Sequence, residues 1–374
     1  MKIVIAMDSF KGTLKAHEAC QITADAITQS VAGAEIVLKP MADGGEGTAI
    51  AMIKAADGQW IRQTVMGPLP DMQVEAGFAW FEADKTALVE MASASGLELI
   101  SKEQANPLKT TTYGTGQLIK AAIKYQPRKI LLAIGGSATV DGGIGAAMAL
   151  GWKFLDGQNK PVGPGGMALE QIEKIVEPEN LNLPPVEVLC DVDNPLCGDR
   201  GAAKVYGPQK GATPQMVEQL EKGLGHLADI VDQQFGRDIK NPPGAGAAGG
   251  LAAGAIAFMN ASLVSGVETV MSHNKLDTEL KSADWIITGE GSFDRQSLYG
   301  KVVSGISALA QGSNAKIAVI AGRVNVPQEE YQKLGITTAV SCRTDDISLD
   351  YALENCRPLL YSAARRFASQ YLCG

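Results

Sequence analysis

Short apolar runs that end in polar, glycine-rich loops constrain the fold of this chain more than any other feature. The first run covers residues 2–7, a polar loop follows over 8–14, and residues 16–31 have the spacing of an amphipathic helix before a second run at 35–39. A strand, a helix and a second strand in this order form a βαβ pattern. Because such units build parallel sheets covered by helices, the sequence predicts an α/β fold.

Apolar runs of the same kind return near the carboxyl end of the chain, at residues 284–289, 316–322 and 336–340, and a helical stretch follows each of them. Earlier, residues 60–91 change toward a period of two and contain a Gly-Pro-Leu-Pro break, which is typical of antiparallel strands. The simplest topology joins the strands from both ends of the chain into one sheet.

The length of the chain, 374 residues, is sufficient for two cores. The middle segment has its own strand–loop–helix unit, which starts at residue 129. We therefore predict a discontinuous flavodoxin-like or Rossmann-like doubly wound domain, residues 1–66 plus 283–374, with a second α/β domain, residues 67–282, inserted into it.

Charge and composition exclude several classes of protein. The formal net charge is −8, and no run of Lys and Arg occurs that could neutralise the phosphates of a nucleic acid or an anionic membrane. The first residues lack the long apolar segment of a secretion signal, and no uncharged apolar stretch approaches the roughly 20 residues of a membrane span. The 6 cysteines contain no C-x-x-C pair, so we expect reduced thiols and a cytoplasmic protein.

Two early loops carry groups that could bind an anion or a metal ion. The loop DSFKG, residues 8–12, places a carboxylate, a hydroxyl and an ammonium at the carboxyl end of a strand, where open α/β sheets bind ligands. The loop MADGGEGT, residues 41–48, places Asp43 and Glu46 among glycines, so that backbone amides could approach a ligand while carboxylates hold Mg²⁺. An ordinary solvated loop, or a glycine-rich turn before a capped helix, remains an alternative for each.

The loop GGSATVDGG, residues 135–143, follows a buried run at 129–134 and precedes an alanine-rich helix. Glycines and hydroxyls before a helix N-terminus can cradle phosphates with N–H donors. This is not a Walker A loop, because G-x-x-x-x-G-K-[ST] occurs nowhere in the chain. The dinucleotide fingerprint is also absent after the first run, which disfavours a nicotinamide enzyme.

Two later loops add acidic and hydroxyl groups. CDVDNPL places Asp191 and Asp193 after an apolar run, where they could orient a hydroxyl nucleophile, accept its proton or bind Mg²⁺, and a simple turn before Pro195 is the competing interpretation. TGEGSFDRQSLYGK, residues 288–301, gathers more polar groups than a connecting loop usually needs. The chain has 3 histidines, none at metal-ligand spacing, so a zinc centre is not expected.

In this order and spacing, the motifs DSFKGTL, PMADGGEGT, GGSATVDGG, CDVDNPL, GAAGG at 246–250 and TGEGSFDRQS resemble those of the type I glycerate kinase family. The match runs from Asp8 to the final helices and so covers essentially the whole chain. The resemblance implies an ATP-dependent, Mg²⁺-requiring kinase of D-glycerate, with one discontinuous flavodoxin-like domain and one inserted domain. It implies phosphorylation at O2, to give 2-phosphoglycerate, with 3-phosphoglycerate as the alternative.

Carried onto this sequence, the family's activity suggests a role for each cluster. D-glycerate would bind Asp8, Ser9, Lys11, Glu290, Ser292 and Asp294, and ATP would bind Gly135, Gly136, Ser137, Ala138 and Thr139. Mg²⁺ would be held, directly or through water, by Asp43, Glu46 and Asp193. Asp191 is the predicted base, and Lys11 is the predicted catalytic cation that neutralises the substrate carboxylate or the transferred phosphoryl group.

Other functions remain open for the same groups. Anion-binding loops and carboxylates also fit a phosphatase or a kinase of another small sugar acid, and a binding protein that holds an anion would show no turnover. The predicted partners are D-glycerate and ATP, without nucleic acid or membrane, and a homodimer is a candidate assembly.

Overall fold

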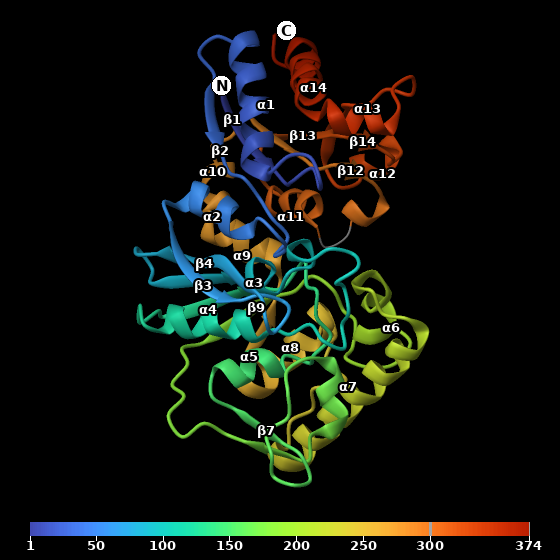
Figure 1. The fold of residues 1–374 in the computed structure, drawn as a ribbon. Coiled ribbons are helices and arrows are strands. Elements are labelled where there is room, and N and C mark those ends of the chain that lie inside the picture. Colours follow the sequence, from blue (N-terminus) through green and yellow to red (C-terminus); the bar gives the residue numbers. More distant parts are fainter. Residues whose placement is uncertain (299–300, 374) are drawn as a thin grey trace. The chain divides into compact units, whose positions relative to one another are not determined.

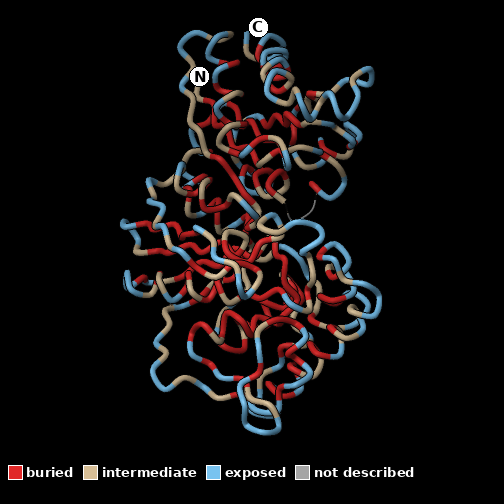
Figure 2. The backbone as a smooth tube through the Cα atoms, viewed as in Figure 1, coloured by how far each residue is buried: buried red, intermediate tan, exposed pale blue. Residues whose placement is uncertain are grey.

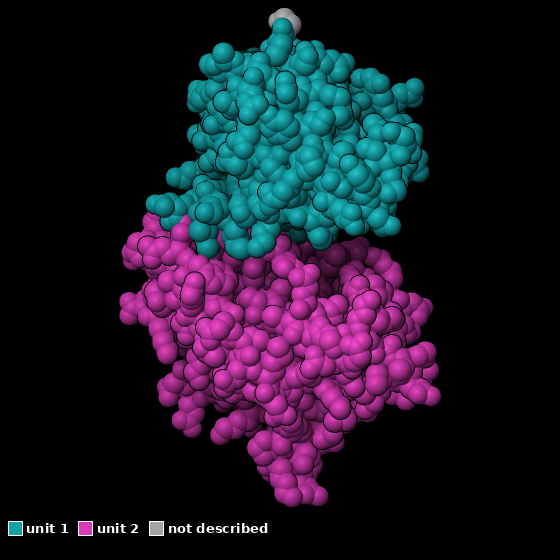
Figure 3. Space-filling model, turned by 45° about the horizontal axis from the view of Figure 1, so that its top comes forward, with its two compact units in different colours: residues 1–43, 50–57, 266–374 teal, residues 44–49, 58–265 magenta. Residues whose placement is uncertain are grey.

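The computed structural model describes residues 1–298 and 301–373. The chain divides into two compact units, which Figure 3 distinguishes by colour. Unit 1 comprises Met1–Asp43, Ile50–Asp57 and Gly266–Gly374, and unit 2 comprises Gly44–Ala49 and Gly58–Ser265. Unit 1 is therefore discontinuous in sequence and is formed by both ends of the chain.

Unit 1 is built on a parallel sheet whose strands run in the order β15-β13-β11-β1-β2 (Figure 1). These strands are β1 (Lys2–Met7), β2 (Glu35–Leu38), β11 (Trp285–Gly289), β13 (Lys316–Ala321) and β15 (Ile336–Ser341). β1 pairs in parallel with both β2 and β11. The expectation that strands from the two ends of the chain share one sheet is thereby confirmed.

Both faces of this parallel sheet are covered. Adjacent residues of a strand point to opposite faces, and Ile286 and Ile287 of β11 are both fully buried. Figure 2 shows the central strands as buried along their length. The helices assigned wholly or mainly to unit 1 are α1 (Ala16–Ser30), α2 (Thr48–Ala56), α9 (Gly266–His273), α10 (Leu276–Leu280), α11 (Val302–Leu309), α12 (Gln328–Gln332), α13 (Leu349–Glu354) and α14 (Cys356–Tyr371). α1 and α14, from opposite ends of the chain, pack side by side.

A short parallel pair of strands completes unit 1. It consists of β12 (Ser292–Phe293) and β14 (Arg323–Val324), and the 3₁₀ helix η4 (Arg295–Leu298) follows β12 directly. β12 lies within the polar segment that follows β11 in the chain.

Unit 2 is built on a mixed sheet in the order β10-β9-β6-β5-β4-β3. Its strands are β3 (Gln59–Met66), β4 (Gln73–Phe81), β5 (Thr86–Glu90), β6 (Lys129–Ala133), β9 (Val186–Leu189) and β10 (Ser262–Val264). β4 is antiparallel to both β3 and β5, which confirms the antiparallel strands expected from the alternating pattern over 60–91. From β5 to β10 the neighbours are parallel.

The helices of unit 2 are α3 (Ala92–Ser95), η1 (Leu97–Leu99), α4 (Tyr113–Ile123), α5 (Ile144–Ala149), η2 (Gly166–Gln171), α6 (Ala202–Tyr206), η3 (Pro208–Lys210), α7 (Pro214–Phe235) and α8 (Ala247–Met259). A small antiparallel pair, β7 (Lys153–Leu155) and β8 (Lys174–Val176), lies apart from the mixed sheet. No described helix combines the length and apolar character that a bilayer span requires.

The boundaries of the two units differ from the predicted domain boundaries. Residues 59–66 form β3, which pairs along its whole length with β4 and therefore lies in unit 2, not with the discontinuous part. Residues 266–282 carry α9 and α10 and lie in unit 1, where α9 packs against α11. Residues 44–49 also lie in unit 2. These three differences arise because membership of a unit depends on long-range pairing and packing, which local sequence patterns do not report.

Candidate active site

The loops DSFKG and TGEGSFD lie side by side in unit 1. The first follows β1 and the second follows β11, and these are neighbouring parallel strands. The N–H of Asp8 donates to the carbonyl of Gly289 at 2.9 Å, and a Cβ added to Gly291 would lie 3.6 Å from the Cα of Phe10. These two loops, which together carry all six predicted glycerate-binding residues, are therefore close neighbours.

Asp8 is the most perturbed acid of this cluster. Asp8 is only 8% exposed, and the N–H of Ser9 donates to its Oδ1 at 2.6 Å. Burial and then the charge of Asp43 raise the pKa of Asp8 to about 7, and Glu290 adds to the rise, while the Ser9 N–H and the Lys11 charge oppose it. A carboxyl group with a pKa near 7 can accept or release a proton at neutral pH.

Lys11 supplies an exposed positive charge beside the carboxyl groups of this cluster. Its side chain is 80% exposed, and its Nζ lies 3.7 Å from the Oδ2 of Asp43. An ion pair of this length and exposure contributes little to stability. The ammonium is therefore available for a negatively charged ligand, and the half-buried Ser9 lies between it and Asp8 in the chain.

Glu290, a half-buried residue, contributes a second carboxylate. Burial raises its pKa, and Ser297 and Lys301 oppose the rise. Within the described part of the chain, its Oε1 is buried without a hydrogen-bond partner. A buried acceptor of this kind normally has a partner, so a hydroxyl group of a ligand would satisfy it.

Ser292 and Asp294 have local roles as well. Oδ1 of Asp294 accepts from the N–H of Gln296 at 2.9 Å, and so caps η4, while the Oγ of Ser292 lies 3.5 Å from Oδ2 of Asp294. Ser292 is exposed and Asp294 is half-buried. Tyr299 and Gly300 of the same motif lie outside the described residues.

The predicted nucleotide loop, residues 135–139, follows β6 in unit 2. A Cβ added to Gly135 would lie 2.5 Å from the Cα of Gly45, so the glycines of this loop and of the MADGGEGT loop pack directly against each other. Gly136 has φ +74° and is exposed, and Ser137 is 9% exposed. The remaining two residues, Ala138 and Thr139, are fully buried and support the loop from below.

The N-terminus of the helix that follows this loop is already occupied. Asp141 is fully buried, and its carboxylate accepts from the N–H and Oγ1 of Thr112, at 2.8 and 2.9 Å, and from the N–H of Gly143 at 3.0 Å. α5 begins at Ile144, so the carboxylate takes the place where an anion would meet the helix. Asp141 therefore occupies the start of α5, and phosphate binding by this loop stays a prediction.

The GAAGG segment at 246–250 fixes the same loop from another side. Gly249 has φ +67°, its carbonyl accepts from the N–H of Gly142 at 3.1 Å, and a Cβ added to it would lie 1.9 Å from the carbonyl oxygen of Thr139. Only glycine can occupy this position without moving the loop.

Gly249→Ala is accordingly expected to lower the free energy of unfolding by about 2–4 kcal/mol, the sum of a left-handed backbone and an overpacked contact. The matched control is Gly225→Ala on α7, where an added Cβ meets no atom within 4 Å. That control should raise stability by about 0.5–1 kcal/mol, because alanine favours a helix interior. Urea denaturation measures both changes, and a Gly249→Ala variant as stable as the parent would contradict the contact.

Asp191 and Asp193 are both exposed. The Nη2 of Arg200 donates to Oδ1 of Asp193 at 2.6 Å, and this bond holds the pKa of Asp193 below its usual range. Beside them, Asn194 accepts from the hydroxyl of Tyr206 at 2.7 Å. Asp193 and Asn194 are therefore tied to the segment 200–206, and Asp193 is engaged by an arginine.

Metal-binding groups are not pre-assembled. Among the residues that the structure describes, no group of three or more His, Cys, Asp and Glu side chains is placed to hold a metal ion. Glu46 does have an acidic neighbour, Glu90 at the end of β5, whose pKa is raised to about 7 by burial and then by the charge of Glu46. The N–H of Ala49 donates to Oε1 of Glu90 at 2.7 Å.

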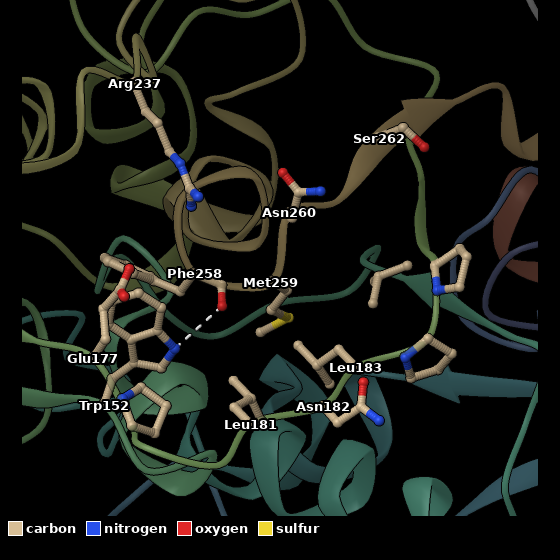
Figure 4. Close-up of a pocket in the computed structure, with 14 residues that line it drawn as sticks. Trp152, Glu177, Leu181, Asn182, Leu183, Arg237, Phe258, Met259, Asn260 and Ser262 are labelled. Atoms are coloured by element: carbon tan, nitrogen blue, oxygen red, sulfur yellow. Dashed lines mark hydrogen bonds between the residues drawn. The ribbon is translucent and has the colours of Figure 1, made fainter.

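A separate pocket of about 530 Å³ lies in unit 2 (Figure 4). Its lining comes from the segment 177–186 and from the end of α8, and the Nε1–H of Trp152 donates to the carbonyl of Phe258 at 3.1 Å. None of the predicted site residues lines it. Its position gives no support to a role in the predicted chemistry.

The sequence analysis did not identify two buried charged residues, Glu90 and Lys210. Glu90 ends a fully buried strand, and a carboxylate at the carboxyl end of a strand next to a parallel neighbour could have been recognised. Lys210 is 2% exposed and donates to Ser137, but nothing in its local sequence, Gly-Pro-Gln-Lys-Gly, signals burial.

Comparisons with known proteins agree with the motifs. The model of the glycerate kinase family matches residues 3–372. The chain is similar to the glycerate kinase of Halalkalibacterium halodurans, with 43% identity over 98% of this chain and 97% of that protein, and to the glycerate 2-kinase of Escherichia coli K12, with 39% identity over 100% and 99%.

Its fold is similar to a crystal structure of a Salmonella typhimurium LT2 protein that carries a glycerate kinase 2 assignment, with a TM-score of 0.87, 38% identity and coverage of 100% of this chain and 99% of that one. A full-length family match, close relatives and a shared mixed α/β fold with parallel strands all agree. The chain therefore belongs to the glycerate kinase family of phosphotransferases.

Proposed function

We propose that this chain transfers the γ-phosphoryl group of ATP to O2 of D-glycerate and releases ADP and 2-phosphoglycerate. The observation that supports this most is that the loops after β1 and β11 lie side by side and bring together the buried Asp8, the half-buried Glu290 and Lys11 in a glycerate kinase family member. The Escherichia coli relative is named glycerate 2-kinase, which favours O2 over O3 as the acceptor.

The strand order supports a ligand at this position. Numbered within unit 1, the order β2-β1-β11-β13-β15 corresponds to the 2-1-3-4-5 order of flavodoxin-like sheets. We therefore take unit 1 to be the doubly wound domain predicted from the sequence. In such sheets ligands bind beyond the carboxyl ends of the strands where the order reverses, here β1 and β11.

D-glycerate has one carboxylate and two hydroxyl groups, and the cluster in unit 1 offers a partner for each. Lys11 would hold the carboxylate, because its ammonium is exposed and only loosely paired. Asp8 and Glu290 would accept hydrogen bonds from the hydroxyls, since Asp8 is buried and the Oε1 atom of Glu290 is buried. Ser9, Ser292 and Asp294 are proposed to complete the edge of the site.

We assign activation of the hydroxyl group to Asp8. In the transfer, the O2 proton passes to the Asp8 carboxylate, the oxygen forms a bond to the γ-phosphorus, and the bond to ADP breaks with its electron pair on ADP. A pKa near 7 suits this role. Asp191, which the sequence predicted as the base, is exposed in unit 2 and stays as the alternative.

ATP is proposed to bind the 135–139 loop, through Gly135, Gly136 and Ser137, with the buried Ala138 and Thr139 beneath them. Mg²⁺ takes few carboxylates and keeps water and phosphate oxygens as its other ligands, so a preformed cluster is not needed. Glu46 fits this chemistry, because its Cβ lies 4.0 Å from the position of a Cβ on Gly136 and Glu90 adds negative charge nearby. Asp43 is the second candidate, whereas the bond with Arg200 makes Asp193 the weakest. The ion would screen phosphate charge.

A coupled ADP-release assay over D-glycerate, L-glycerate and related hydroxy acids tests the proposed function. We expect turnover with D-glycerate and ATP, its loss when Mg²⁺ is removed with a chelator, and a phosphorus NMR spectrum of 2-phosphoglycerate. Appearance of 3-phosphoglycerate would shift the acceptor to O3. Phosphate release from phosphoglycerate without ATP, or binding without turnover, would contradict the proposal.

A further inference from the structure

Lys210 is buried in unit 2 beneath the 135–139 loop. It ends η3 and is 2% exposed, although lysine is rarely buried unless its ammonium is paired. Its Nζ donates to the Oγ of Ser137 at 2.6 Å and to the carbonyl of Thr139 at 2.8 Å. Burial of a cation is unfavourable, and both hydrogen bonds that offset it here join Lys210 to the 135–139 loop.

Asp141 is the charged group that acts on Lys210. Burial lowers the pKa of Lys210 to about 7. The charge of Asp141 opposes this fall, and among the described residues no other charged group shifts the pKa of Lys210. Asp141 itself is bound to Thr112 and Gly143 and fills the N-terminus of α5. Positive potential behind the loop must then come from Lys210 and not from that helix.

The direction of the hydrogen bond decides what Ser137 can do. In its ammonium form, which prevails below about pH 7, Lys210 has three donors and no acceptor, so the Oγ of Ser137 accepts from it. The hydroxyl hydrogen of Ser137 must therefore point away from Lys210. A donor that is itself bonded to a cation is strengthened, and the neighbouring Gly136 is exposed.

We propose that Lys210 is a positioning residue for the phosphoryl donor: it holds Ser137 so that the serine hydroxyl donates to a phosphate oxygen of the bound nucleotide. Lys210 remains beneath the loop and does not contact the nucleotide. The inference rests on the proposed binding of ATP to this loop, and it assigns a function to a residue outside every recognised motif.

A double-mutant cycle tests this arrangement. Ser137→Ala and Lys210→Met should each raise the KM for ATP by about 10-fold, the loss of one charge-assisted hydrogen bond, with the KM for D-glycerate within about twofold of the parent. The double variant should be no worse than the worse single variant, because Lys210 acts through Ser137. Lys204→Met, at an exposed lysine on α6, is the control and should leave both constants unchanged.

The outcomes separate the inference from the proposed function. An unchanged KM for ATP in Ser137→Ala would show that ATP does not bind this loop, and both would fall. An effect of Ser137→Ala without one of Lys210→Met, or effects that multiply in the double variant, would overturn the positioning role and leave the loop assignment standing.

A measurement on the intact lysine covers the case in which Lys210→Met does not fold. Above pH 7 a neutral Lys210 amine can accept the Ser137 proton, which turns the hydroxyl inward. The ratio of the ATP KM in Ser137→Ala to that in the parent should therefore fall toward 1 as the pH rises from about 6 to about 9. Titration of ATP itself cancels in this ratio. A ratio independent of pH would overturn the inference.

Discussion

Replacement of Asp8 by asparagine is expected to reduce kcat by about 10²-fold or more, because general-base catalysis typically contributes 10²–10⁴-fold. Asparagine keeps the size and can still bond to the substrate hydroxyl, but it cannot take up a proton. The KM for ATP should change little, since Asp8 lies in unit 1 and the proposed nucleotide loop lies in unit 2. Steady-state kinetics with both substrates varied measures this pattern.

The pH profile gives an independent signature of Asp8. Since its pKa is raised to about 7, kcat of the parent should rise with pH through about 7 and then level off. The residual activity of Asp8→Asn should lack this rise. Asp25→Asn, an exposed aspartate on α1, is the control and should retain both kcat and the profile. A full effect in Asp191→Asn with none in Asp8→Asn would return the role of base to Asp191.

The same substitution should stabilise the fold at neutral pH. An unfolded Asp8 ionises near 3.8 and the folded group near 7, so the folded state binds more protons between these values and stability falls as the pH rises through that window. Asparagine removes this loss. The unfolding temperature of Asp8→Asn relative to the parent should therefore increase between about pH 4 and about pH 7. The raised pKa of Glu90 is present in both proteins and cancels.

Lys11→Ala is expected to raise the KM for D-glycerate by about 10- to 100-fold, the range for loss of a hydrogen bond to a charged group. The reason is that Lys11 supplies an exposed ammonium beside the carboxyl groups of Asp8 and Glu290, which would otherwise repel an anionic substrate. If the charge acts mainly in the transition state, kcat falls instead and KM stays constant. Either result supports the placement.

Lys15→Ala provides the matched control, because Lys15 is an exposed lysine of the same segment. It should leave kcat and both KM values near those of the parent. Removal of Lys11 with no change in the KM for D-glycerate or in kcat, in a folded protein, would mean that the substrate binds elsewhere. Screening provides a further check, since the Lys11 effect should weaken at high ionic strength.

Much of the fold was predictable because it depends on local patterns. The runs that became β1, β11, β13 and β15 are short, apolar and followed by helices, and their assignment to one parallel sheet is confirmed. The convergence of residues 8–12 with 290–294 followed from the same argument, since carboxyl ends of parallel strands lie at one edge. The assignment of β3 did not follow, because its partner β4 decides its sheet.

The amino-acid sequence by itself determined the α/β class, the family and the loops that carry the chemistry, because those depend on motifs and on periodicity along the chain. Only the tertiary structure decided which charges are buried. Lys210 is 71 residues from Thr139 in the chain, and Asp141 is 29 residues from Thr112, yet these contacts set the hydrogen bonds of both groups. Burial lowers the pKa of Lys210 and raises the pKa of Asp141. Burial and long-range hydrogen bonds are properties of packing, and a local pattern does not report them.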